Sequence, residues 1–246
     1  MPAIPLEGKT AIVTGASSGF GKVIAERLRK EGIRVAVGAR RVDRLEGDFA
    51  HELDVTDPRS AEPFVTAAVE ALGGLDILVN NAGGAIGRYP FGDSNEEDEE
   101  WMIEANVRGL IRMTRLCLPH IRDGGHIVNM DSIAGKQAYE NAAVYCAVKA
   151  AVSMFSAALR EDLLGRPIRV TDLAPGLAGG TEFSLVRFKG DEEKAKAVYQ
   201  GVEPLTADDI ADCVLFALTR PLHVNVDEIV VKALAQTSGG RILRDQ

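Results

Sequence analysis

Short apolar runs, rich in valine and isoleucine, alternate along the chain with longer segments in which apolar positions recur at helical spacing. This alternation is typical of a parallel sheet with helices on both faces, because its strands are buried on both sides. The pattern predicts one α/β domain over residues 1–246, built on a doubly wound sheet of seven parallel strands. We expect these strands at residues 10–14 and 33–39, in a short segment that ends at Leu53, and in segments that begin at Leu75, Gly125, Ile168 and Glu228.

Helical periodicity covers the segments between the predicted strands. Helices are expected at about 20–31, 59–72, 97–123, 143–165 and 207–219, and one or two more within 181–199. Only about ten residues separate the second strand from the third, which leaves room for a helix of one or two turns at most.

Composition narrows the class of partner. The 246 residues carry 28 basic and 36 acidic side chains without a basic stripe, and the net charge of −8 favours a small-molecule substrate over nucleic acid or an anionic membrane. No basic stretch followed by a long apolar core opens the chain, and no apolar run approaches the ~18 residues of a membrane span, so a cytoplasmic protein is expected. The three scattered cysteines predict neither a disulfide framework nor a metal site.

A glycine-rich turn joins the first strand to an amphipathic helix. Glycine allows the backbone to approach a ligand closely, and the helix N-terminus favours a phosphate, so this context predicts dinucleotide binding. The alternative is a glycine-rich turn selected only for tight packing. The expected contacts are Gly15, Ser17, Ser18, Gly19, Phe20 and Gly21.

The end of the second strand predicts which dinucleotide binds. An acidic side chain there would accept the ribose hydroxyls of NAD, but this chain has Ala39 followed by Arg40 and Arg41. Two guanidinium groups match a 2′-phosphate, so NADP(H) is expected rather than NAD(H). The alternative is that one arginine, more simply Arg41, is only a solvated loop charge.

Tyr145 and Lys149 stand four residues apart in a helical segment, downstream of Ser132. Side chains at i and i+4 lie on one helix face, so the ammonium is expected beside the phenol. Lowering a tyrosine pKa from ~10 to near neutrality takes roughly 4 kcal/mol, which a close cation can contribute. Such pairs also arise by chance, but this one predicts a proton donor and acceptor that works near pH 7.

Together with NNAG at 80–83, Asn106 in IEANVRG and the pair Pro175 and Gly176, these motifs span nearly the whole chain. In this order they resemble the motifs of the short-chain dehydrogenase/reductase family. The resemblance implies a Rossmann-type fold and a homotetramer assembled through the helices near 97–123 and 143–165.

A closer similarity, over residues 169–191 and 223–229, is to the bacterial NADP-dependent dehydrogenases of 3-hydroxy acids and of serine or allo-threonine. It implies hydride transfer between NADP(H) and a small 3-hydroxy acid or hydroxy amino acid (serine, allo-threonine or 3-hydroxypropionate type), with the 3-oxo acid or semialdehyde as the other partner. Two alternatives stay open: an NADPH-dependent reductase of a larger aldehyde or ketone, and a catalytically idle NADP(H)-binding sensor or scaffold.

The resemblance implies a role for each catalytic residue. Tyr145 would exchange a proton with the substrate oxygen, Lys149 would lower the tyrosine pKa and bind the nicotinamide ribose, and Ser132 would hydrogen-bond the same oxygen. Asn106 would hold a relay water, or serve only as a polar residue that bends its helix, and no metal is implied. Further cofactor contacts are implied at Asp54, Val55, Asn81, Ala82, Gly83, Pro175, Gly176, Leu177 and Thr181, and Asn80 is expected to tie neighbouring strands.

Three further features bear on the substrate. Residues 177–203 are expected to form a substrate lid, in which Arg187 would bind a carboxylate or would be only an exposed helix arginine. Asp131 departs from the small or apolar residue that the family implies there; we expect a hydrogen-bonded structural carboxylate, or a charge that tunes substrate choice. The acidic run 93–100 is expected to begin a helix, with Ser94 or Asn95 as its cap, rather than to bind a metal.

Overall fold

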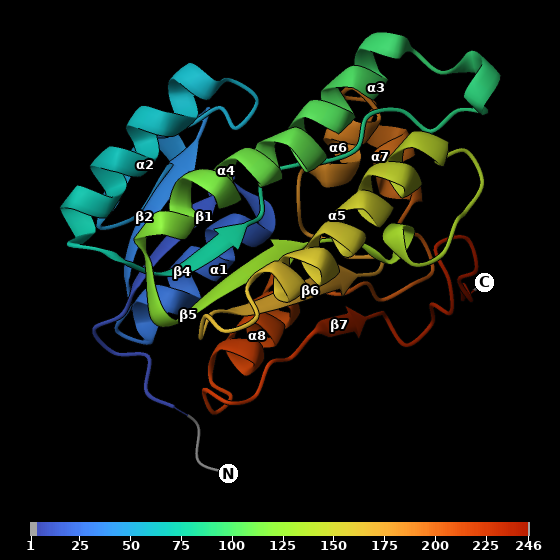
Figure 1. Cartoon of the computed structure of the whole chain (residues 1–246). Helices are drawn as coiled ribbons and strands as arrows, with labels where there is room; N and C mark the ends of the chain where they lie inside the picture. The colour runs from blue at the N-terminus through green and yellow to red at the C-terminus, as the bar shows by residue number, and fades with distance from the viewer. Residues whose placement is uncertain (1–3, 246) are drawn as a thin grey trace.

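Seven parallel strands form one sheet in the computed structural model, which describes residues 4–245 (Figure 1). The spatial order is β3-β2-β1-β4-β5-β6-β7, which is the doubly wound arrangement predicted from the sequence. The strands are β1 Thr10–Thr14, β2 Arg34–Ala39, β3 Phe49–Glu52, β4 Leu75–Asn80, β5 Ile121–Met130, β6 Arg169–Pro175 and β7 Glu228–Val231.

Helices cover both faces of the sheet. One layer holds α1 (Gly19–Lys30) and α8 (Ala207–Leu218), and the other holds α2 (Pro58–Leu72), α4 (Gly109–Cys117) and α5 (Ala143–Asp162). The remaining helices lie beyond the carboxyl ends of the strands, and these are α3 (Glu96–Ile103), α6 (Phe183–Arg187) and α7 (Glu192–Ala197).

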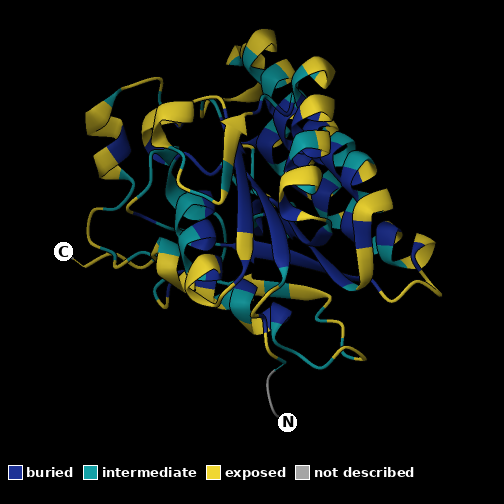
Figure 2. Cartoon of the chain, turned by 90° about the vertical axis from the view of Figure 1, so that its left-hand side faces the viewer, coloured by how far each residue is buried: buried dark blue, intermediate teal, exposed yellow. Residues whose placement is uncertain are grey.

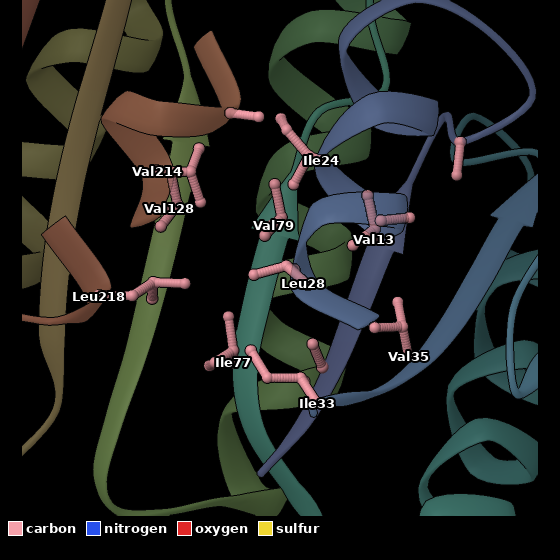
Figure 3. Packing of buried hydrophobic residues seen from close by; sticks show 14 of the residues in the cluster. Val13, Ile24, Leu28, Ile33, Val35, Ile77, Val79, Val128, Val214 and Leu218 are labelled. Carbon is pink, nitrogen blue, oxygen red and sulfur yellow. The ribbon is translucent and has the colours of Figure 1, made fainter. Parts of the chain in front are cut away.

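The apolar runs of the sequence become the core on both faces. In Figure 3, Ile24 and Leu28 of α1 and Val214 of α8 point onto Val79 and Val128 of the sheet. Figure 2 shows the central strands buried and the outer helix surfaces exposed. Each fully buried aliphatic side chain of this kind contributes roughly 1.5–3 kcal/mol, so the two layers hold the strand ends at fixed positions.

The expected helix over 97–123 is wrong at its C-terminal end. Helix α3 passes through a π-helical turn, Glu104–Arg108, into α4, which ends at Cys117. Pro119 lacks a backbone N–H and cannot make the next α-helical hydrogen bond, so only a 3-10 turn follows. Strand β5 therefore begins at Ile121, earlier than the predicted Gly125.

Other boundaries agree with the predictions. The connection between β2 and β3 holds a single 3-10 turn, Val42–Arg44, and 181–199 holds two short helices. Helix α3 begins at the acidic run, with Asn95 accepting a hydrogen bond from Asp98 N. Asn80 ties β4 to β5 as expected, since its amide donates to the Asn129 side chain over 2.9 Å.

Helix α5 corrects the expectation that no segment is apolar enough to span a membrane. Among the described residues it alone passes that test by length and composition. It packs against β5 and β6, with Val152 and Leu159 buried at the interface, which is the position of a core helix.

Candidate active site

The order of the strands reverses between β1 and β4, and crevices form at such points beyond the carboxyl ends of the strands. A cavity of about 630 Å³ opens there. It is lined by most of the residues predicted from the sequence, namely Gly15, Ser17, Ser18, Gly19, Phe20, Arg40, Arg41, Asp54, Val55, Asn81, Ala82, Gly83, Ser132, Tyr145, Lys149, Pro175, Gly176, Leu177, Thr181 and Arg187. Gly21 and Asn106 lie beside the cavity and do not line it.

The glycine-rich turn is shaped by close backbone packing. A Cβ on Gly15 would lie 2.9 Å from the Cα of Ala82, and a Cβ on Gly21 would lie 2.6 Å from the carbonyl oxygen of Gly15. Gly15 and Gly19 also have positive φ angles of 68° and 57°. Gly21 thus lets α1 approach the turn, while Gly15 lets the turn pack against the segment after β4.

The segment after β4 is held against this turn. Thr14 accepts hydrogen bonds on Oγ1 from the backbone N–H groups of Asn81 (3.0 Å) and Ala82 (2.9 Å). The Asn81 amide donates to the Thr14 carbonyl over 2.9 Å. Two loops that are far apart in sequence therefore form one rigid wall of the cavity.

The end of β2 supplies a cluster of cationic groups. Arg41 donates to Ser18 Oγ over 2.8 Å and forms an ion pair with Glu182 at 2.7 Å, so the interpretation of Arg41 as only a solvated charge is wrong. Arg44 pairs with the other oxygen of Glu182 at 2.9 Å, while Arg40 lines the cavity without a described hydrogen bond.

Sequence reasoning missed two members of this cluster. Arg44 could have been found from its spacing, because it lies three residues after Arg41 in a connection expected to form one turn, and such a turn brings the two side chains together. No local pattern indicates Glu182, because its partners lie far away in the chain.

Tyr145 and Ser132 meet at the opposite end of the cavity. Tyr145 is buried against Phe183, with ring centroids 6.0 Å apart. Burial raises the pKa of Tyr145 and Tyr139 adds to the effect, while the Ser132 hydroxyl and Arg187 act to lower the same pKa. Ser132 accepts a hydrogen bond from Ala134 N over 3.1 Å, which fixes its side chain at the start of a 3-10 turn.

Lys149 shares the helix face and the cavity with Tyr145, as predicted. Its Nζ lies 6.0 Å from the Tyr145 ring centroid and donates to the Met130 carbonyl over 2.9 Å. Burial lowers the pKa of Lys149 to about 8, against the opposing charges of Asp131 and Asp172. Removal of the phenol from water leaves the pKa of Tyr145 above its usual value, and the role of Lys149 in lowering that pKa stays a prediction.

Asn106 lies in the π-helical turn. Its amide donates to the carbonyls of Gly84 (2.9 Å) and Met102 (2.8 Å), and its Oδ1 accepts from Gly84 N (3.1 Å). A Cβ on Gly83 would lie 2.5 Å from that oxygen. The structure therefore displays the structural role that the sequence allowed, in which Asn106 ties the segment after β4 to the helix.

Arg187 projects from α6 into the catalytic end of the cavity. Its Nε donates to the Gly87 carbonyl over 3.1 Å, and Nη1 donates to the Tyr139 hydroxyl over 3.0 Å. The residue is 8% exposed, and its buried Nη2 has no hydrogen-bond partner among residues 4–245. A buried cationic donor without a partner is costly, so this geometry suits an anion and excludes the exposed-arginine interpretation.

Three residues around this end were missed by sequence reasoning. The ring centroid of Tyr139 lies 5.6 Å from the guanidinium carbon of Arg88 and 5.7 Å from that of Arg187. Gln236 accepts a hydrogen bond from Leu177 N over 2.6 Å. All three come from loops without periodicity, so no pattern in the sequence identifies them.

Asp131 is buried, but it is not the hydrogen-bonded carboxylate that we expected. Its side chain is ion-paired with Lys136 at 3.4 Å, and neither oxygen has a hydrogen-bond partner among the described residues. Within residues 4–245, no group of three or more His, Cys, Asp or Glu side chains is placed to hold a metal ion.

The sequence and fold match known proteins along most of their length. A profile described as short chain dehydrogenase matches residues 9–190. The NADP-dependent 3-hydroxy acid dehydrogenase YdfG of Escherichia coli (strain K12) is 42% identical over 239 residues, which cover 93% of this chain and 96% of that protein. The NADP-dependent 3-hydroxy acid dehydrogenase of Schizosaccharomyces pombe is 38% identical over 257 residues and 98% of both chains.

Solved structures agree with these sequence matches. The closed form of serine dehydrogenase complexed with NADP+ has a TM-score of 0.90 and 40% identity, covering 96% of this chain and 100% of that one. Serine dehydrogenase from Escherichia coli has a TM-score of 0.79 and 35% identity, covering 93% and 99%.

Proposed function

The chain belongs to the short-chain dehydrogenase family, and we propose that it is an NADP(H)-dependent oxidoreductase of small 3-hydroxy acids. It would interconvert a hydroxy acid or hydroxy amino acid, of the serine, allo-threonine or 3-hydroxypropionate type, and the 3-oxo acid or semialdehyde. The names of the relatives and the NADP+ complex of the similar serine dehydrogenase support the cofactor and the substrate class.

The cavity fits NADP(H) in shape and charge. The glycine-rich turn lines the cavity, and α1 begins there with its N-terminus toward the cavity. Arg40 and Arg41 would bind the 2′-phosphate, with Ser17 and Ser18 beside them. The cofactor supplies hydride transfer at the nicotinamide; every other step falls to the chain's own residues.

Tyr145 would hold or take the proton of the substrate oxygen at its hydroxyl, and Ser132 would donate a hydrogen bond to the same oxygen. The burial that raises the pKa of Tyr145 keeps the phenol protonated, which suits proton donation during reduction. Oxidation needs the phenolate, and the cationic groups of Lys149 and Arg187, 6.0 and 5.4 Å from the ring centroid, would stabilise that charge.

The observation that carries the substrate class is the unpartnered Nη2 of Arg187. This buried cation lies 5.4 Å from the Tyr145 ring centroid, measured from the guanidinium carbon. A carboxylate one carbon removed from the reacting carbinol could accept from the guanidinium while the carbinol oxygen faces Tyr145 and Ser132. A neutral alcohol would leave that donor buried without a partner, which costs binding energy.

Arg187 also connects substrate binding to the proposed lid, residues 177–203. Its backbone carbonyl accepts from Gly87 N over 2.8 Å, and Lys189 pairs with Asp98 at 2.7 Å, so the lid rests on the segment after β4. An anion bound at Arg187 would add a contact across the same cavity and favour the closed arrangement.

We further propose a cytoplasmic homotetramer assembled through the α4 and α5 layer. On and just after α5, Met154 is 70% exposed and Leu164 is 87% exposed, which leaves apolar area for a partner subunit. Light scattering after gel filtration should give four times the mass of 26.3 kDa, and a monomer would contradict the proposal.

The function is tested by following NADPH absorbance with 3-hydroxy acids, hydroxy amino acids, neutral alcohols and larger carbonyl compounds of matched reactivity. The proposal expects oxidation of small 3-hydroxy acids with NADP+ at the highest kcat/KM. A preference for bulky aldehydes or ketones would replace it with a biosynthetic reductase. Tight NADPH binding without turnover of any compound would indicate a sensor.

A further inference from the structure

Asp131 occupies an unusual electrostatic position beside the proposed reaction centre. It follows the last residue of β5 and precedes Ser132, yet its side chain is 0% exposed. An ionised carboxylate without hydrogen bonds in such a place is costly unless neighbouring charge compensates it. Its state therefore depends on the cations that surround it.

Lys136 is the first of these cations. Its Nζ lies 3.4 Å from Asp131, but also 2.5 Å from Asp172 of β6 and 2.8 Å from Glu228 of β7. One ammonium thus pairs with three carboxylates, which come from the residue after β5, the middle of β6 and the start of β7. Glu228 is half-exposed and hydrated, whereas Asp131 and Asp172 are buried, so this lysine alone leaves negative charge in the interior.

Lys149 is the second cation. Its Nζ donates to the carbonyl of Met130, the residue directly before Asp131. Gly135 lies where this helix and the carboxylate meet, since a Cβ there would be 2.7 Å from both Asp131 Oδ1 and the Lys149 carbonyl oxygen. The absence of a side chain at 135 allows this approach.

The charges act on each other in the expected directions. Burial lowers the pKa of Lys149, and Asp131 is the largest influence that raises it. Burial, followed by Asp172, raises the pKa of Asp131, while Lys149 and Lys136 lower it. Each member of the Asp131 and Lys149 pair therefore favours the charged form of the other.

We propose that Asp131, held by Lys136, is a positioning residue whose carboxylate is the buried counter-charge that keeps the Lys149 ammonium charged beside Tyr145. The proposal rests on the proposed function, because a charged Lys149 matters for turnover only if Tyr145 transfers the proton. Of the charged and titratable groups around Lys149, Asp131 follows β5, Lys136 ends the next 3-10 turn, Asp172 lies in β6 and Tyr145 lies on the same helix.

The direct test measures the protonation of Lys149 in the NADP+ complex. The ¹³Cε chemical shift of labelled lysine is followed against pH in the wild type and in Asp131→Asn, with the signal assigned by its loss in Lys149→Met. The titration midpoint of Lys149 should fall by about one pH unit or more in Asp131→Asn, the size expected for loss of a close opposite charge. The alkaline limb of kcat/KM should move in the same direction.

Two further variants complete the test. Asp131→Ser removes the same charge with a smaller side chain, so the Lys149 midpoint should fall again. Glu228→Gln is the matched control, because it removes the half-exposed carboxylate of the Lys136 cluster, which is not among the charges that raise the pKa of Lys149, and it should leave the midpoint unchanged. If Asp131→Asn does not fold, Asp131→Ser decides the question.

An unchanged Lys149 midpoint would overturn the proposal, whether or not the Tm is lower. Failure of both Asp131 variants to fold would also overturn it. Either result would assign Asp131 and Lys136 a role in stability alone. The Lys149 midpoint is measured without substrate, so this proposal and the proposed function can fail separately. A lower midpoint in Asp131→Asn, in an enzyme that oxidises no hydroxy acid, would reject the proposed function and support Asp131 as the counter-charge. An unchanged midpoint in an enzyme that oxidises hydroxy acids would reject the counter-charge and support the proposed function.

Discussion

Arg187 lies over the ring of Tyr145, with its guanidinium carbon 5.4 Å from the ring centroid. The two residues come from different elements, α6 of the lid and α5 of the helix layer. One cation can thus act on the substrate and on the acid/base group, since it offers a free donor to an anion and lowers the tyrosine pKa. This relationship leads to the first two predictions.

Replacing Tyr145 by Phe removes the hydroxyl and keeps the ring that packs on Phe183. We expect kcat to fall by ~10²–10⁴, the usual contribution of a positioned proton donor. The dissociation constant of NADPH, measured by fluorescence titration, should remain close to that of the wild type. Turnover near the wild-type rate would exclude Tyr145 as the acid/base.

Replacing Arg187 by Met removes the charge and keeps much of the side-chain volume. Loss of a charge-assisted hydrogen bond of ~1.5–3 kcal/mol should raise KM for 3-hydroxy acids by ~10- to 100-fold. KM for neutral alcohols should change little. Arg88→Met is the matched control, because Arg88 also lies near the Tyr139 ring but has no described contact with the Tyr145 ring. An equal effect on acids and alcohols would contradict the anion site.

Arg41→Ala should weaken NADPH binding and spare NADH binding. The guanidinium lies beside Ser18 at the phosphate loop, and its loss removes charge-assisted bonds of ~1.5–3 kcal/mol, or ~10- to 100-fold in Kd. Arg59→Ala on α2 is the control, with a side chain that is 91% exposed. Equal loss for both cofactors would show that Arg41 only shapes the loop.

Gly21→Ala should destabilise the fold and the cofactor site together. Its Cβ would lie 2.4 Å from Asn81 Nδ2 and 2.6 Å from the Gly15 carbonyl, so both loops must move. Such overpacking costs about 1–3 kcal/mol, visible as a lower Tm and weaker NADPH binding. Gly92→Ala, which meets nothing within 4 Å, should leave both unchanged.

Because of the buried His126, we expect the free energy of unfolding to decrease in acid. This residue is buried in β5 beside Thr171, and burial lowers its pKa to about 3, with Arg169 adding to the effect. The unfolded chain binds a proton at this histidine near pH 6.5, and the folded chain does not. The contribution of His126 to the free energy of unfolding is therefore fully present above pH ~6.5 and falls by up to ~1.4 kcal/mol per pH unit below it.

Urea unfolding between pH 7 and pH 4 measures this slope. His126→Gln should flatten it, whereas the exposed control His51→Gln should retain it. A slope that is the same in His126→Gln and in the wild type would assign the acid sensitivity to other groups.

Local patterns in the sequence were sufficient for most of the fold. All seven strands were predicted, and the five inner ones carry the clearest signal, because they are largely buried on both faces and read as apolar runs. The edge strands β3 and β7 are more exposed. The helix over 97–123 was predicted too long because its boundary depends on Pro119 within an otherwise helical pattern. The π-helical turn at Asn106 has no periodic signal of its own.

The sequence by itself determined the order of the motifs along the chain, the glycine-rich turn after the first strand, and the position of Tyr145 and Lys149 on one helix face. These features follow from short-range geometry. Only the tertiary structure decided how those groups are charged. Burial raises the pKa of Tyr145, and folding places Arg187 over its ring and Lys136 beside Asp131. Desolvation and Coulomb interactions depend on distances between residues that are far apart in the chain, and folding sets those distances.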